Sequence, residues 1–132
     1  MQVSSKGRYA LRIMSDIARH EEDFVPISDI AIRQSITVKY LEKIMSMLSK
    51  AKLVVSFRGA NGGYKLAKPA KEYSVLEILE AVGEGTKLTV CTSNGECDMA
   101  HSCDTMKVWF KLSELINGYL KTVTLEDLIK NN

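Results

Sequence analysis

The three cysteines of this 132-residue chain constrain it most, because all of them fall within thirteen consecutive positions. Cys91, Cys97 and Cys103 are separated by five residues each, in a stretch of small and polar side chains. An odd number of cysteines in one polar loop does not suit a disulfide framework, whereas converging thiolates are ligands of iron or zinc. The spacing therefore predicts a metal-binding loop that separates two halves of the chain.

Those two halves differ in charge. Residues 1–71 carry 13 Lys and Arg against 6 Asp and Glu, whereas residues 72–132 carry 5 against 10. A basic segment suits a polyanionic partner, because neutralising phosphates releases their counterions. The first half is therefore a candidate for nucleic-acid binding, and the acidic second half is not.

Apolar periodicity predicts three helices before residue 51. The first runs from Ser5 to about His20, and the second runs from a candidate N-cap at Ser28 to Gln34. A tight turn at residues 35–37 leads into the third, so the second and third helices form a helix-turn-helix. The residues expected to face inward on the third helix are Val38, Leu41, Ile44, Met45 and Leu48.

The outward face of the third helix is the predicted DNA contact. Thr37 precedes it, and its first turns carry Lys39, Tyr40, Glu42 and Lys43, which have the hydrogen-bonding groups that meet base edges and phosphates in a major groove. Taken alone, such a face is more often an ordinary solvated helix surface. The segment that follows it favours DNA.

Residues 53–67 predict a β-hairpin whose tip is Arg58-Gly-Ala-Asn-Gly-Gly63. Glycines permit a compact tip, although ordinary turn geometry also explains them. At that tip Arg58 and Gly59 can approach a phosphate backbone or a narrow minor groove. A helix-turn-helix followed directly by a hairpin is a winged helix, so the predicted fold class is mainly α with a small β-hairpin wing.

The second half predicts a capped helix at residues 74–82, the cysteine loop, and a long helix from residue 104 onward. The apolar stripe of that helix is too wide for one small chain to cover, and a homodimer with a second copy would cover it and would suit palindromic double-stranded DNA. Thr124 to Asp127 predicts a second capping box. We therefore expect a winged-helix DNA-binding domain at residues 1–71 and a cluster-loop and dimerisation region at 72–132, packed as one unit.

Several stretches resemble the family of winged-helix regulators that includes IscR, NsrR, RirA and CymR. They are Lys6-Gly-Arg-Tyr-Ala-Leu-Arg12, Tyr40-Leu-Glu-Lys-Ile44, residues 53–64, the cysteine triplet and Thr124-Leu-Glu-Asp-Leu128. The similarity covers nearly the whole chain, and the cysteine spacing is similar to that of the IscR-like, cluster-binding branch.

The resemblance implies a transcription repressor and redox sensor in which Cys91, Cys97 and Cys103 hold a 2Fe-2S or 4Fe-4S iron-sulfur cluster. It also implies that Glu42 discriminates bases, that Arg58 enters the minor groove, and that Tyr40 contacts the DNA backbone. The fourth ligand departs from the family. The IscR-like histidine position is Met106, and the NsrR-like aspartate position is Arg8. Within the loop His101, Asp98 and Asp104 are candidates, and an external ligand or one from the partner subunit stays open.

Other functions remain open at this point. One alternative is that the loop binds zinc, and another is that the protein is a cluster-free thiol switch or small-molecule-responsive regulator. A third is a metal-stapled protein-interaction module or iron-sulfur carrier. Three buried core cysteines suit so polar a loop poorly. An enzyme is disfavoured, because the only histidines are His20 and His101 and no catalytic triad or phosphate loop is evident. No membrane span or signal peptide is predicted, so we expect a cytoplasmic protein.

Overall fold

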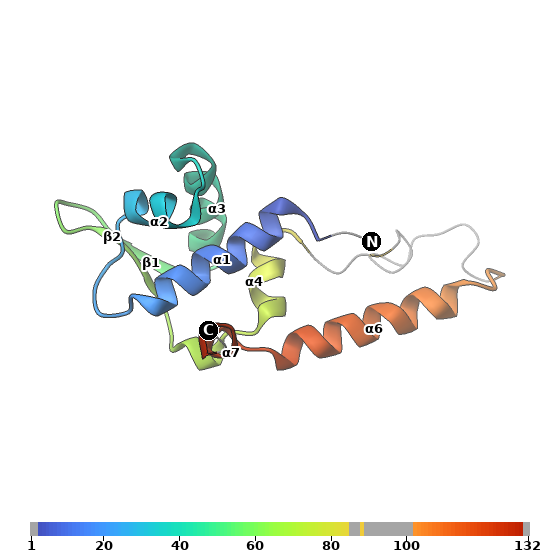
Figure 1. Ribbon diagram of the computed structural model, residues 1–132. Coiled ribbons are helices and arrows are strands. Elements are labelled where there is room, and N and C mark those ends of the chain that lie inside the picture. Colours follow the sequence, from blue (N-terminus) through green and yellow to red (C-terminus); the bar gives the residue numbers. More distant parts are fainter. Residues whose placement is uncertain (1–2, 85–87, 89–101, 131–132) are drawn as a thin grey trace.

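The computed structural model describes residues 3–84, 88 and 102–130, and these are mainly helical with one two-stranded sheet (Figure 1). The elements in chain order are α1 (Ser5–Arg19), α2 (Ile27–Gln34), α3 (Val38–Lys50), β1 (Val54–Phe57), β2 (Gly63–Leu66), the 3-10 helix η1 (Ala70–Glu72), α4 (Val75–Ala81), α6 (Met106–Thr122) and α7 (Leu125–Lys130). This is the predicted winged helix-turn-helix followed by a long helix. None of the described helices is long and apolar enough to cross a membrane.

The core lies between α1, α2 and α3, where the predicted apolar faces meet. Ile13 and Ile17 of α1, Ile30 of α2, and Leu41 and Ile44 of α3 are fully buried. Burying each such side chain stabilises the fold by roughly 1.5–3 kcal/mol. This packing sets the angle at which α3 is held.

The structure corrects one core prediction on α3. Val38 was predicted to face inward, but it is 43 % exposed. It is the first residue of α3, and at 100° per residue it lies beside the stripe of Leu41, Ile44 and Leu48 rather than within it.

The predicted N-cap of the second helix is also wrong. Pro26, and not Ser28, occupies the N-cap position, and it has no side-chain cap hydrogen bond. The Pro26 carbonyl accepts from the backbone N–H groups of Asp29 (3.1 Å) and Ile30 (3.3 Å). The fixed φ of proline suits the entry to a helix, and Asp29 in the first turn complements the helix dipole.

The turn between α2 and α3 depends on one left-handed residue. Ser35 has φ 53°, and the N–H of Ile36 donates to the Ala31 carbonyl (3.1 Å), which closes the end of α2. Ile36 is buried beneath the turn. Thr37 then caps α3, because its side-chain oxygen accepts from the backbone N–H of Tyr40 at 3.2 Å.

A buried carboxylate fixes α2 against α1. Asp16 is only 3 % exposed, and it accepts hydrogen bonds from Arg33 (2.7 and 3.0 Å) and from the side-chain amide of Gln34 (2.8 Å). Arg12 donates to the side-chain and backbone oxygens of Gln34. Burial alone would raise the pKa of Asp16, but the hydrogen bonds from Arg33 and Gln34 and the charge of Arg33 outweigh it, so the pKa is lowered.

The hairpin is antiparallel, with Val54 paired with Leu66 and Phe57 with Gly63. β2 also forms a bridge to the α1–α2 connection, where Val25 and Tyr64 exchange backbone hydrogen bonds of 2.8 Å. Gly63 has φ +153°, and a Cβ there would lie 2.2 Å from the Val25 carbonyl oxygen. Only glycine permits this close approach, which ties the hairpin to the helical core.

Tyr73 joins the base of the hairpin to the C-terminal part of the chain. Its buried hydroxyl donates to the Leu53 carbonyl and accepts from the backbone N–H groups of Ala67 (2.9 Å) and Lys68 (3.2 Å). Its backbone carbonyl accepts from Leu125 at 3.0 Å. One residue therefore connects β1, the exit of β2 and the start of α7.

The predicted caps of the C-terminal helices form to different extents. At α4, Ser74 accepts from the Glu77 N–H (3.0 Å), while the Glu77 carboxylate pairs with Lys68 (2.9 Å). At α7 the box is complete, because Thr124 and Asp127 each accept from the backbone N–H of the other. Between them α6 extends away from the rest of the molecule, with its Met106 end farthest out (Figure 1).

Replacing Asp16 by Asn tests the buried pair. Because the pKa of Asp16 is lowered by folding, its ionised carboxylate stabilises the fold at pH values above the unfolded pKa, and this contribution is lost as the pH falls through the folded pKa. We expect Asp16→Asn to lower the free energy of unfolding by about 1.5–3 kcal/mol at pH 7. The difference from wild type should shrink below about pH 4, as measured by urea unfolding of the metal-free chain followed by circular dichroism.

Glu80→Gln is the control, because Glu80 is an exposed carboxylate on α4. It should change the free energy of unfolding by less than about 0.5 kcal/mol at either pH. A deficit in Asp16→Asn that stays the same from pH 7 to pH 3 would contradict the assignment of an ionised buried carboxylate.

Candidate nucleic-acid interface

The outward face of α3 carries three of the predicted DNA-contacting side chains. Lys39, Glu42 and Lys43 are exposed, on the side of the helix opposite Leu41 and Ile44. Thr37 is exposed just ahead of them. The buried side of α3 fixes the helix in the core, so these polar side chains share one solvent-facing surface.

Tyr40 differs from its neighbours, because it is half-buried and contacts α1. Its ring packs edge-on against Tyr9, with centroids 5.8 Å apart, and the Arg12 guanidinium lies 5.2 Å from the Tyr9 ring centroid. Arg12 also binds Gln34, so it links the end of α2 to the Tyr9 ring that packs against Tyr40. The sequence pattern did not predict the Tyr9–Tyr40 and Arg12–Gln34 contacts, because they join positions 31 and 22 residues apart.

Arg58 and Gly59 lie at the exposed tip of the hairpin. The tip is closed by a hydrogen bond from the Gly62 N–H to the Gly59 carbonyl (3.0 Å), and Gly59 has φ +129°. Figure 1 shows the hairpin projecting beyond the helices as a wing. The structure thus places the Arg58 side chain on an extended element that is separate from α3.

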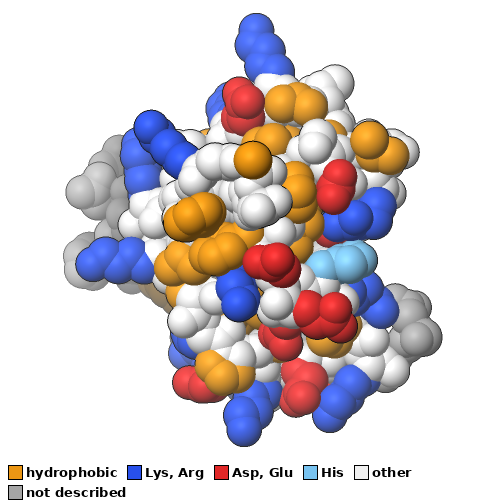
Figure 2. Space-filling model, turned by 90° about the vertical axis from the view of Figure 1, so that its left-hand side faces the viewer, with side chains coloured by type: hydrophobic (Ala, Val, Ile, Leu, Met, Phe, Trp, Pro, Cys, Tyr) orange, Lys and Arg blue, Asp and Glu red, His pale blue; other side chains and the backbone are white. Residues whose placement is uncertain are grey.

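Figure 2 views the hairpin end of the molecule and shows hydrophobic side chains near the centre of this face, with basic and acidic side chains beside and around them. Phe57 of β1 is 56 % exposed, and its ring lies 5.4 Å from that of Phe24 in the α1–α2 connection. Lys65 of β2 covers the Phe24 ring at 5.7 Å. This aromatic contact is a second link between the wing and the helices.

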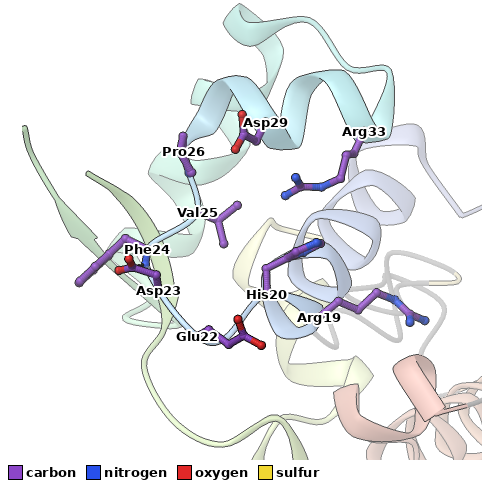
Figure 3. A pocket seen from close by; sticks show the side chains of 9 residues that line it. All are labelled: Arg19, His20, Glu22, Asp23, Phe24, Val25, Pro26, Asp29 and Arg33. Carbon is purple, nitrogen blue, oxygen red and sulfur yellow. Dashed lines mark hydrogen bonds between the residues drawn. The ribbon is translucent and has the colours of Figure 1, made fainter. Parts of the chain in front are cut away.

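A shallow pocket of about 230 Å³ lies between the end of α1 and the start of α2 (Figure 3). Its walls mix the basic side chains of Arg19, His20 and Arg33 with acidic ones, among them Glu22 and Asp29. The groups are partly engaged already, since Arg33 binds Asp16 and the His20 Nδ1 lies 2.7 Å from the Asp16 carbonyl oxygen. The pocket therefore does not favour a ligand of one charge.

Of the predicted metal ligands, Cys103 and the candidate Asp104 lie within the described residues; Cys91, Cys97, Asp98 and His101 lie outside them. Cys103 is half-exposed just before α6, and its Sγ is 3.2 Å from the Thr105 Oγ1. Hydrogen bonds from the Thr105 side chain and from the Thr105 and Met106 backbone lower the pKa of the thiol. A thiol that ionises readily at a helix N-terminus fits a metal ligand, although residues 3–84, 88 and 102–130 alone contain no group of three candidate ligands.

Comparison with known proteins gives a consistent result. The family model Rrf2, described as "Iron-dependent Transcriptional regulator", matches residues 3–131. The HTH-type transcriptional regulator IscR of Photobacterium profundum is 41 % identical over 133 residues, which cover 100 % of this chain and 77 % of that protein. IscR of Serratia proteamaculans is 43 % identical, with 99 % of this chain and 80 % of that protein covered.

Solved structures agree in fold. CymR, the global cysteine regulator of B. subtilis, superposes with a TM-score of 0.81 at 28 % identity and covers 100 % of this chain and 98 % of its own. IscR of T. potens gives a TM-score of 0.81 at 34 % identity, with coverages of 99 % and 88 %. The chain therefore belongs to the Rrf2 family of iron-dependent transcriptional regulators: it is a winged-helix DNA-binding protein of the IscR type, and not an enzyme.

Proposed function

We propose that this chain is a cytoplasmic, homodimeric repressor that binds palindromic double-stranded DNA and senses iron, redox or nitric oxide state through an iron-sulfur cluster. One observation carries the DNA-binding part of this proposal. The buried side of α3 is locked into the core, while its polar face and the Arg58 tip are both exposed on elements that are tied to the same helices. Such an arrangement suits simultaneous contact with two grooves of one duplex.

In this proposal α3 enters the major groove, with Lys39, Glu42 and Lys43 facing base edges and phosphates. Thr37 and Tyr40 contact the backbone, and the contact of Tyr40 with Tyr9 holds its ring in position. Arg58 and Gly59 approach the adjacent minor groove, where narrow grooves attract arginine. The charge of +7 over residues 1–71 supports binding to phosphates.

The surface of α6 supports a homodimer. Phe110, Leu115 and Tyr119 are 44 %, 58 % and 67 % exposed, and Ser113 is the one buried residue of this helix. A helix with so much exposed apolar surface is stabilised by a partner. When that partner is a second copy related by two-fold symmetry, the apolar surface of α6 is covered in both copies at once. Two-fold symmetry in turn suits palindromic DNA.

The residues that would hold the cluster are Cys91, Cys97 and Cys103, with His101 as a candidate for the fourth position. The lowered pKa of Cys103 supports thiolate ligation at this position. When bound, a 2Fe-2S or 4Fe-4S cluster supplies an iron centre that responds to oxidation, nitric oxide or iron supply. The protein's own part is to lower the pKa of Cys103 through hydrogen bonds at the N-terminus of α6.

A chain of contacts supports coupling between α6 and the winged helix. It joins the two regions that the sequence divides near residue 71. At the far end of α6 the Val123 carbonyl accepts from the Val75 N–H (2.8 Å), and Leu125 donates to the Tyr73 carbonyl. The Tyr73 hydroxyl then holds Leu53 and Ala67 at the base of the wing. A change in the angle of α6 would therefore alter the spacing of the two recognition surfaces in a dimer.

A cluster-free thiol switch is the second candidate function. The half-exposed Cys103 has a lowered pKa, and reactive cysteines share these properties. The two candidates predict different iron contents, so the cluster test described below separates them.

Arg58→Ala tests the wing. Removing the arginine should weaken specific DNA binding by about 1–3 kcal/mol, because a cation is lost from the groove. Binding is measured by filter retention on a duplex selected in vitro from a random library. Lys71→Ala is the control, since Lys71 is an exposed cation of the same basic half on η1. Equal effects of the two substitutions would contradict a specific role of the wing arginine.

Anaerobic purification tests the cluster. The wild type should show visible absorption and stoichiometric iron and acid-labile sulfide, and Cys97→Ala should lose most of both, because three thiolates are needed to hold the cluster. Ser102→Ala, next to Cys103, should retain them. A colourless, iron-poor wild type would rule out the cluster and favour the thiol switch.

A further inference from the structure

Val38 is exposed at the start of α3, beside the polar face that carries Lys39, Glu42 and Lys43. The exposed positions of α3 otherwise carry charged or hydroxyl side chains, namely Lys39, Glu42, Lys43, Ser46 and Lys50. Val38 is thus the one apolar side chain among them, and folding of the described chain leaves 43 % of it in water. Packing in the core does not account for a valine at this position.

The helix geometry places Val38 beside Glu42. Residues four apart lie on the same side of a helix, one turn from each other, so Val38 precedes Glu42 by about 6 Å along the axis of α3. Val38 is also the first residue of the helix, directly after the Thr37 cap. The N-terminal end of a recognition helix is the part that meets base edges.

The chemistry of the major groove limits what Val38 could recognise there. Base edges present hydrogen-bond donors and acceptors, which a valine cannot engage, and one apolar group, which is the C5 methyl of thymine. We propose that Val38 is a specificity-determining residue that recognises a thymine through this methyl group, close to the base pair that Glu42 contacts. The inference rests on the proposed entry of α3 into the major groove.

The rival explanation is that Val38 is an ordinary exposed apolar residue, since single ones are common on protein surfaces. Ile32 of α2 is 77 % exposed. Exposure alone therefore does not decide between the two explanations. A direct test must remove the methyl group from the DNA and the valine methyls from the protein, separately and together.

The experiment uses a duplex selected in vitro by the wild-type protein from a random library. Each thymine of one half-site is replaced in turn by deoxyuridine, which lacks only the methyl group, and affinity is measured by fluorescence anisotropy at fixed salt. The proteins are the wild type, Val38→Ala, and Val55→Ala as the matched control, because Val55 is a valine of β1 with 46 % exposure.

We expect one thymine at which loss of the methyl weakens wild-type binding about fourfold, the effect of exposing roughly one methyl group. Val55→Ala should show the same loss, whereas Val38→Ala should bind the two duplexes within 1.5-fold of each other, on the order of measurement error. If every thymine behaves alike in wild type and Val38→Ala, the proposal is overturned while DNA recognition by α3 stands. If no sequence is enriched in the selection, both proposals fall.

Discussion

The hydrogen bonds of Tyr73 are the constraint on which the arrangement of this molecule depends. The buried hydroxyl forms hydrogen bonds with backbone groups of Leu53, just before β1, and of Ala67 and Lys68, just after β2. The Tyr73 backbone carbonyl accepts from the Leu125 N–H. The Leu53 carbonyl, whose bond to Tyr73 is buried, would cost about 1–3 kcal/mol if it lost this partner. The wing and the C-terminal helices are therefore held by one residue, and neither can be reoriented without disturbing the other.

A second buried group makes comparable contacts just ahead of α3. Asp16 fixes Arg33 and Gln34 at the end of α2, and Arg12 joins Gln34 to the Tyr9 and Tyr40 pair. The recognition helix thus begins from a turn that is fixed by ionic and aromatic contacts. In contrast, α6 exposes apolar surface along its length, which supports the proposed homodimer. The contacts that fix α3 in the winged helix, and the exposed apolar surface of α6, together suit the proposed dimer. In such a dimer the distance between the two α3 helices could change.

Much of the fold could be predicted from the sequence, because local patterns determine it. The three N-terminal helices, the hairpin and the α7 capping box follow from apolar spacing, glycines and side chains that cap their own helices. Ser28 and Val38 were predicted wrongly, because Pro26 already begins α2 and because the first residue of a helix lies beside the stripe that its later turns bury. The contacts of Asp16 with Arg33 and Gln34, and those of Tyr73 with Leu53 and Leu125, join residues 17 to 52 positions apart, so no local pattern contains them. The DNA-contacting roles of the α3 and wing residues stay predictions. The metal ligands do too, since Cys91 and Cys97 lie outside the described residues.

The central claim is that the cysteine loop controls how the winged helix meets DNA. The most direct measurement compares the affinity of one anaerobic preparation for its selected duplex before and after the iron is removed by a chelator, at matched salt and protein concentration. The account predicts at least about a tenfold difference, equivalent to roughly 1.4 kcal/mol of coupling, together with little change on a scrambled duplex. Equal affinities of the loaded and metal-free forms would contradict it.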